Sequence, residues 1–291
     1  MKNKAIEIWD KVIPGYKLLD SGQKEKLEEI NGKKIIRKEP RAWWQKTLIE
    51  QDWSDANKEI EEILDIGIAG VKAKVNFKEA SKHIGIFPEQ AQEWQWISEK
   101  ITKSKSQNPN KKIKVLNLFG YTGIASLVAA ASGAEVTHVD ASKQSVEWAK
   151  ENQKISGLED LPIRWIVDDA VKFLKREIKR KESMPAESQG YDAIIMDPPS
   201  YGKGPKGEVW KAETKLPEFL KICSEALSTE PRFVILNMYS TELSSLSLSN
   251  MLVDMMTGKG GTVTSGELAI KQEASDKILP MSIFSIWENV R

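Results

Sequence analysis

The stretch that decides the fold is IKVLNLFGYTGIASLVAAASGAEVTHVD, residues 113–140. Its first seven residues form an apolar run that predicts a buried strand. The small-residue segment that follows predicts a helix ending at Gly133, and EVTHVD (135–140) predicts a second strand. A strand, a helix and a strand in close succession are typical of the parallel unit of α/β proteins.

The same alternation continues to the end of the chain. Further strands are predicted at 163–169, 191–197 and 232–239, with helical segments between them. The last two strands, 261–270 and 281–288, have no long helix between them, which predicts a closing hairpin with one antiparallel strand. We therefore expect an α/β fold, Rossmann-like, with a seven-stranded and mostly parallel sheet at 113–291.

Residues 1–80 have a different character and predict a small strand-rich N-terminal domain. YKLLDSG (16–22) and KKIIRKEPRAWW (33–44) read as short strands, and Asn31-Gly32 reads as a turn. Four tryptophans are crowded here, either to close a small core or to present an aromatic surface: Trp9, Trp43, Trp44 and Trp53.

Between the two parts, 81–112 is expected to be a helical connector that contributes to a cofactor site. Its helix is predicted at 87–104, because Trp94, Ile97 and Ile101 fall on one stripe. The segment 106–112 is a loop by composition.

Bulk properties exclude several classes of protein. The chain has 291 residues and a formal net charge of +1, so nucleic-acid binding would depend on local patches. With Cys223 as its single cysteine and only His83 and His138, it has no disulfide framework and no cysteine or histidine metal site is expected. No signal peptide or membrane-length apolar segment is present in the sequence, so we expect a cytoplasmic protein without a membrane partner.

Successive predicted strands end in a glycine turn or an acid. Gly120 follows the first strand, Asp140 ends the second, Asp168 and Asp169 end the third, and Asp197 ends the fourth. Carboxyl ends of parallel strands share one edge of the sheet, where nucleotide-like ligands bind. A packing turn and helix-capping acids are the alternative for each position alone. The residues match neither the G-x-G-x-x-G pattern of dinucleotide sites nor a P-loop.

These residues in this order resemble the motif series of class I S-adenosylmethionine-dependent methyltransferases, and more closely the group that includes large-subunit ribosomal RNA methyltransferases. The resemblance covers about residues 80 to 291, and it implies S-adenosylmethionine as the cofactor and ribosomal RNA as the substrate. It implies cofactor contacts from Phe87, Gln90, Asn117, Phe119, Gly120, Tyr121, Thr122, Gly123, Asp140, Ala141, Ser142, Asp169 and Ala170. It places Asp197, Pro198 and Pro199 at the transferred methyl group.

Two positions depart from the pattern of this family. Ala91 stands where the family's box before the core carries arginine, so Gln90 becomes the expected contact to the cofactor carboxylate. Asn117 stands where an acid is usual, which removes a carboxylate contact to the cofactor ammonium.

The residues also bear on which atom is methylated. Carbon-5 methylation of a pyrimidine needs a cysteine nucleophile, and the loops DPPSYG (197–202) and LNMYST (236–241) have none. Cys223 is predicted to pack in a helix. An Asp197 carboxylate in a proline-stiffened loop favours transfer to a base nitrogen.

Substrate contacts are expected around the same loop. Tyr201 is predicted either to stack on a base, as a member of the catalytic loop, or to pack on the loop. Ser200, Lys203 and Lys206 are the expected substrate-binding residues, whereas the basic run at 172–181 reads either as a solvated face or as a phosphate track. A protein or small-molecule methyltransferase, and a non-catalytic RNA-binding or cofactor-sensing module, remain alternatives.

Overall fold

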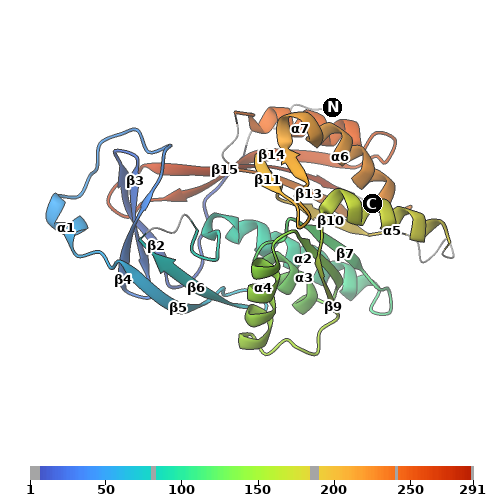
Figure 1. Cartoon of the computed structure of the whole chain (residues 1–291), viewed down its shortest axis with the longest axis horizontal. Coiled ribbons are helices and arrows are strands. Elements are labelled where there is room, and N and C mark those ends of the chain that lie inside the picture. Colours follow the sequence, from blue (N-terminus) through green and yellow to red (C-terminus); the bar gives the residue numbers. More distant parts are fainter. Residues whose placement is uncertain (1–6, 80–82, 184–189, 240–241, 290–291) are drawn as a thin grey trace.

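The computed structural model describes residues 7–79, 83–183, 190–239 and 242–289. Its centre is an eight-stranded sheet in the order β1-β14-β15-β13-β10-β7-β8-β9 (Figure 1). The five parallel strands in the middle and at one edge are β7 (Lys114–Leu118), β8 (Glu135–Asp140), β9 (Ile163–Val167), β10 (Ala193–Met196) and β13 (Phe233–Met238). These strands are the ones predicted from the alternation, within a few residues at each end.

The predicted closing hairpin is confirmed. β14 (Thr262–Lys271) and β15 (Ile278–Glu288) pair with each other, and β15 runs antiparallel to β13. The sheet has one more strand than the seven expected, because β1 (Glu7–Trp9) pairs in parallel with β14. A three-residue strand whose partner lies more than two hundred residues away has no local periodicity, so the sequence pattern did not reveal it.

Helices cover both faces of the sheet (Figure 1). Side chains of β7 alternate between two apolar clusters, with Val115 in one and Leu116 and Leu118 in the other. The first cluster includes α2 (Ala91–Gln107) and α3 (Ile124–Ala131), with α4 (Lys143–Ile155) beside α3; the second includes α5 (Ala170–Glu182), α6 (Ala212–Ala226) and α7 (Ser245–Met255). This two-sided covering explains why the central strands are apolar throughout.

The N-terminal part is built from antiparallel strands, as expected. β2 (Tyr16–Gly22), β3 (Glu25–Ile30) and β4 (Lys33–Lys38) form one sheet; α1 (Glu50–Ser54) follows, and then the hairpin of β5 (Glu59–Asp65) and β6 (Lys72–Lys78). Asn31 and Gly32 have φ angles of 48° and 80°, which confirms the predicted turn between β3 and β4. The boundaries at residues 80 and 112 remain predictions.

Of the four N-terminal tryptophans, Trp9 and Trp53 are buried and Trp44 is half-buried, as the core-closing interpretation predicts. That interpretation is wrong for Trp43, which is 79% exposed.

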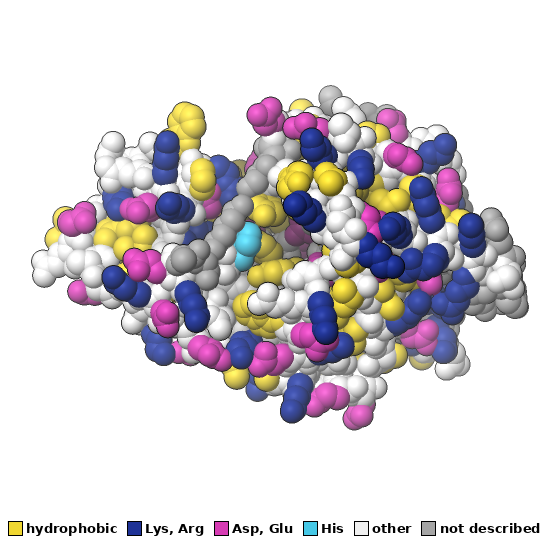
Figure 2. All heavy atoms as spheres, viewed as in Figure 1, with side chains coloured by type: hydrophobic (Ala, Val, Ile, Leu, Met, Phe, Trp, Pro, Cys, Tyr) yellow, Lys and Arg dark blue, Asp and Glu magenta, His cyan; other side chains and the backbone are white. Residues whose placement is uncertain are grey.

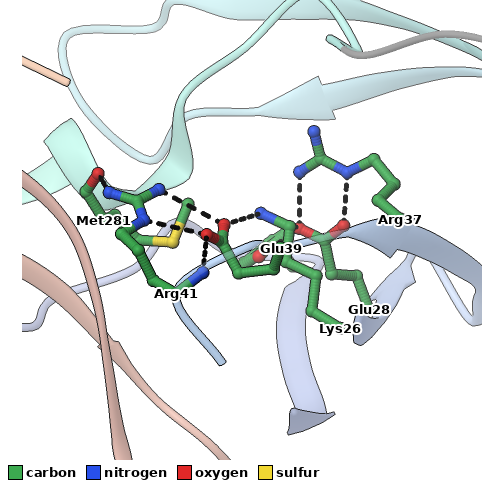
Figure 3. A network of polar contacts seen from close by, with 7 residues as sticks. Lys26, Glu28, Arg37, Glu39, Arg41 and Met281 are labelled. Atoms are coloured by element: carbon green, nitrogen blue, oxygen red, sulfur yellow. Dashed lines mark hydrogen bonds and ion pairs between the residues drawn. The ribbon is translucent and has the colours of Figure 1, made fainter. Parts of the chain in front are cut away.

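Two polar joints fix the N-terminal strands to the β14–β15 hairpin. Gln272, just after β14, donates to Asp20 Oδ1 (2.9 Å) and accepts from Ser21 Oγ (2.6 Å). Arg41 donates to the carbonyl of Met281 on β15, and it pairs with Glu39 at 2.8 Å (Figure 3). These side chains are buried or half-buried, so the joints are shielded from water and hold the strand-rich part in place.

Three local expectations need adjustment. A 3-10 turn, η1 (Pro88–Gln90), precedes α2, and α2 continues to Gln107, into the segment expected to be a loop. The segment after Asp197 folds into a short hairpin, β11 (Tyr201–Lys203) and β12 (Val209–Lys211), and α6 begins at Ala212 and contains Pro217 in its interior.

None of the helices in the described parts of the chain has the length and apolar character that crossing a bilayer requires.

Candidate active site

The turn after β7 has a strained backbone at the sheet edge. Phe119 and Tyr121 have φ angles of 57° and 50°, a left-handed conformation that is costly for non-glycine residues and is concentrated at functional sites. Gly120 between them leaves no room for a side chain, because a Cβ there would lie 2.5 Å from Nδ1 of His138. The turn therefore tolerates little change of sequence.

A buried polar chain lies beneath this turn. Asn117 donates to Ser126 Oγ (2.9 Å), and Ser126 Oγ lies 3.0 Å from His138 Nδ1. Burial lowers the pKa of His138 to about 3, so the imidazole is neutral near pH 7. Trp165 packs against it with ring centroids 4.7 Å apart. The chain gives the glycine turn a rigid support.

Asp140 ties two loops of the sheet edge together. Its Oδ2 accepts from the backbone N–H of Tyr121 (2.9 Å), and its Oδ1 accepts from that of Ser142 (2.8 Å). Burial raises the pKa of Asp140, while these two hydrogen bonds act in the opposite direction. Each carboxylate oxygen keeps a further lone pair for a ligand hydroxyl.

The two acids after β9 have different partners. Asp168 pairs with Arg176 of α5, whereas Asp169 caps α5 by accepting from the backbone N–H of Lys172 (2.9 Å). Asp169 thus has the capping contact considered as an alternative, and it also lines a cavity at the sheet edge. Capping and ligand binding are compatible at this position.

A cavity of about 280 Å³ gathers most of the predicted residues. The ones that line it are Phe87, Phe119, Tyr121, Asp140, Ala141, Ser142, Asp169, Ala170, Asp197, Pro199 and Lys203. They come from separate loops at the carboxyl ends of β7, β8, β9 and β10 and from the segment before α2, so the fold brings together residues far apart in the sequence.

A smaller cavity of about 40 Å³ adjoins it, because Phe87, Phe119, Tyr121 and Asp197 line both. Four more predicted residues line the smaller one: Gln90, Asn117, Gly120 and Thr122. Among the predicted residues, all of which the structure describes here, Gly123, Pro198, Ser200, Tyr201 and Lys206 line neither.

Asp197 stands at the junction of the two cavities. Gln90 Nε2 donates to Asp197 Oδ2 at 2.8 Å. Burial raises the pKa of Asp197 to about 6, with a further increase from nearby Glu89 and a decrease from the Gln90 hydrogen bond. A carboxylate with a pKa near neutrality is suited to accept a proton or a hydrogen bond at physiological pH.

The loop after Asp197 is held by a side chain from the neighbouring hairpin. Trp210 Nε1 donates to the carbonyl of Pro199 (2.6 Å), so one lone pair of this carbonyl already has a protein partner. Tyr201 is 54% exposed on β11. Lys203 lines the larger cavity beside Asp168 and Asp169, whereas Lys206 lies in the hairpin turn, where its backbone N–H donates to Glu208.

Several residues at the site were missed in the sequence, among them His83, Glu93, Trp210, Asn237 and Tyr239. Tyr239 directly follows β13, so extending the strand-end argument to a fifth strand would have found it. Glu93 is fully buried and burial raises its pKa to about 8; Asn237 donates to its Oε2 at 2.6 Å. An acid in an amphipathic helix gives no local sign of such burial.

The basic helix and the cysteine are not part of these cavities. Lys and Arg side chains gather over α5 (Figure 2), but Lys172 pairs with Glu208 and Lys181 donates to two backbone carbonyls at the end of α6. Cys223 is fully buried in α6, and burial raises the pKa of its thiol well above the usual value. These contacts fit the solvated-face and packing interpretations.

Comparison with known proteins places this geometry in context. The chain is 38% identical to the S-adenosylmethionine-dependent methyltransferase of Agrobacterium tumefaciens, with a TM-score of 0.88 over 98% of this chain and 94% of that one. SMU.776, crystallised with S-adenosylhomocysteine, shares the fold at 17% identity, with a TM-score of 0.67 over 95% of this chain and 76% of that one. No family model matches.

Curated relatives match over a shorter region. Ribosomal RNA large subunit methyltransferase K/L of Shewanella frigidimarina is 30% identical over 144 residues, 49% of this chain and 19% of that protein. The protein of the same name from Vibrio cholerae is 34% identical over 114 residues, 39% of this chain and 15% of its own. The matched region is thus less than a fifth of these relatives.

Proposed function

Because this chain belongs to the S-adenosylmethionine-dependent methyltransferases, we propose that it methylates a base nitrogen of ribosomal RNA without a covalent cysteine intermediate. The observation that carries the proposal is Asp197, a buried carboxylate at the junction of two cavities at the carboxyl edge of the sheet. The RNA part draws on the names of the curated relatives.

The cofactor supplies an electrophilic methyl group on a sulfonium. In our proposal Asp140 holds the ribose hydroxyls, Ala141, Ser142, Asp169 and Ala170 surround the adenine, and the backbone at 117–123 contacts the methionine part. The cavity of about 280 Å³ lined by these acids supports this placement.

We place the charged end of the cofactor in the smaller cavity. Glu93 Oε1 and Asn237 Oδ1 are buried acceptors with no hydrogen-bond partner among the described residues, and both residues line it beside Asn117. An ammonium group has three donors for such acceptors. We propose that Glu93 takes the role of the acid that is usual at position 117, where this chain has Asn117. Gln90 is expected to contact the cofactor carboxylate. It also donates to Asp197, and this hydrogen bond orients the Asp197 carboxyl.

Asp197 is proposed to accept a hydrogen bond from the N–H of the target nitrogen and then its proton. At pH 7 a carboxyl with a pKa of about 6 is mostly ionised, yet it is more basic than an ordinary aspartate. Positioning of the target nitrogen supplies most of the remaining rate enhancement, because methyl transfer needs only an in-line approach of that nitrogen to the methyl group.

A covalent thiol step is disfavoured by the position of Cys223. Its side chain is fully buried in the apolar cluster around α6 and lines neither cavity. A thiol with a raised pKa is a poor nucleophile. This supports direct transfer to nitrogen over carbon-5 chemistry.

The test compares modified nucleosides in ribosomal RNA from cells with and without the gene. We expect one N-methylated nucleoside to disappear and to return with the wild-type gene, but not with Asp197→Ala. If no methylated nucleoside changes, the RNA proposal is wrong. If Asp197→Ala restores the nucleoside fully, Asp197 is not catalytic.

A further inference from the structure

A second large cavity lies between the N-terminal strands and the central sheet. It measures about 570 Å³, within the range of ligand pockets, and it is lined from β3, β4, the segment after β4, η1 and β15. We call this cavity the interdomain cleft.

The cleft meets the cofactor cavity at a set of aromatic rings. His83, Phe87 and Tyr239 line both cavities. The ring centroids are 5.4 Å apart for His83–Phe87, 5.9 Å for His83–Tyr239 and 6.0 Å for Phe87–Tyr239. Three planar rings at the wall shared by these two cavities offer stacking surfaces for a flat group that reaches from the cleft toward Asp197.

Two polar atoms of the cleft have no hydrogen-bond partner within the described part of the chain. These are Oε2 of Glu89, whose side chain is only 4% exposed, and Oγ of Ser282 on β15. A buried polar atom without a partner is costly, and native proteins keep one chiefly where a ligand or other partner satisfies it. Glu89 offers an acceptor, and Ser282 offers a donor and an acceptor.

A fixed ionic network also lines the cleft (Figure 3). Arg37 donates two hydrogen bonds to Glu28, and Lys26 Nζ lies 3.5 Å from Glu28 and 3.7 Å from Glu39. Arg41 joins Glu39 to the backbone of β15, as described above. The carboxylates hold these cations in place, so the wall is preorganised, while Lys38 is exposed at its edge.

We propose that the interdomain cleft is the substrate site and receives one unstacked nucleotide of an RNA chain. The base stacks among His83, Phe87 and Tyr239. A base N–H donates to Glu89, and the Ser282 hydroxyl forms a hydrogen bond with a second polar edge of the base. Lys38 lies near the phosphate backbone of the RNA. Enzymes that modify a base must take it out of its stack and read it with aromatic and polar groups of this kind. This rests on the proposed function and names the site at which its substrate binds.

The test uses the purified full chain, ribosomal RNA from cells lacking the gene, and S-adenosylmethionine with a tritiated methyl group. Glu89→Met removes the acceptor at similar size, Ser282→Ala removes the hydroxyl, and Lys38→Glu reverses the exposed charge. Lys103→Glu, an exposed lysine near the end of α2 that does not line the cleft, is the matched charge control. S-adenosylhomocysteine affinity, measured separately by calorimetry, reports on folding and on the cofactor site.

We expect Glu89→Met to lower kcat/KM for RNA by about tenfold or more. Lys38→Glu should raise KM for RNA several-fold at low salt, with the difference shrinking as salt increases. Affinity for S-adenosylhomocysteine should stay within twofold of wild type in both, and the Lys103→Glu variant should match wild type throughout.

If the wild type methylates RNA and all three cleft variants match Lys103→Glu, the cleft proposal is wrong and the proposed function stands. If the wild type methylates a protein fraction and no RNA, the proposed function itself fails. If Glu89→Met alone loses cofactor affinity, the Ser282 and Lys38 variants decide whether the cleft binds RNA.

Discussion

Replacing Asp197 by asparagine should make this protein more stable and much less active. The carboxyl is buried, and its pKa rises from the usual 3.8 to about 6. A carboxyl whose pKa is higher in the folded than in the unfolded chain destabilises the fold as pH rises through these two values. The asparagine side chain has no charge to bury, and its carbonyl can still accept from Gln90.

The size of the effect follows from the shift. A rise from 3.8 to about 6 corresponds to about 3 kcal/mol at 1.36 kcal/mol per pKa unit, fully present above pH 7. The linkage relation reduces this to roughly half at pH 5, where the folded carboxyl is mostly protonated. Urea denaturation of the wild type and Asp197→Asn at pH 5 and pH 8 measures both values.

Asp254→Asn, an exposed position on α7, serves as the control and should show no such difference. Methyl transfer by Asp197→Asn should fall by about 10²-fold to 10⁴-fold, the usual contribution of a general base, with S-adenosylhomocysteine still bound. Equal stability of wild type and variant at pH 8, or a gap that does not change with pH, would refute the buried-carboxylate account.

Four further predictions concern the surroundings of the site. Gly120→Ala places a Cβ against fully buried His138, so it should cost about 1–3 kcal/mol in urea denaturation and weaken S-adenosylhomocysteine binding in calorimetry. Glu28→Ala leaves buried cations without their counter-charge, so we expect a loss of about 3–5 kcal/mol and a lower Tm in a thermal scan. Cys223→Ala should retain methyl transfer within about twofold, because a direct mechanism needs no thiol; complete loss with the cofactor still bound would support a cysteine mechanism. Burial raises the pKa of Glu93 to about 8, so at pH 7 its carboxyl is mostly neutral, and binding a cationic ammonium should lower that pKa and release close to one proton. Calorimetry of S-adenosylhomocysteine binding in two buffers of different ionisation enthalpy measures this release, which Glu93→Gln should abolish.

The parallel core could be predicted because its signal is local. Apolar runs such as 113–118 and the turn at Gly120 stand in the sequence in the order in which the elements form. β1 and the hairpin after Asp197 were not predicted. β1 is three residues long and pairs with a strand from the other end of the chain. The proline and glycine spacing after Asp197 is typical of a loop, although the segment forms a hairpin.

In the site, too, the features with a local sequence signal could be predicted and those that depend on tertiary packing could not. Acids at strand ends were predicted, since parallel strands bring their carboxyl ends to one edge. The unpartnered acceptors of Glu89 and Glu93 could not be predicted, because burial within η1 and α2 arises only when the connector packs against the sheet. The engagement of the Pro199 carbonyl by Trp210 likewise depends on the β11–β12 hairpin.

One measurement tests the central claim most directly: the transfer of a tritiated methyl group from S-adenosylmethionine to ribosomal RNA of cells lacking the gene, by purified wild-type protein. We predict that the label enters RNA, is recovered in a single N-methylated nucleoside, and is lost with Asp197→Asn. Label recovered at carbon 5 of a pyrimidine, or undiminished transfer by Asp197→Asn, would contradict the proposed mechanism. No label in RNA at all would contradict the proposed substrate.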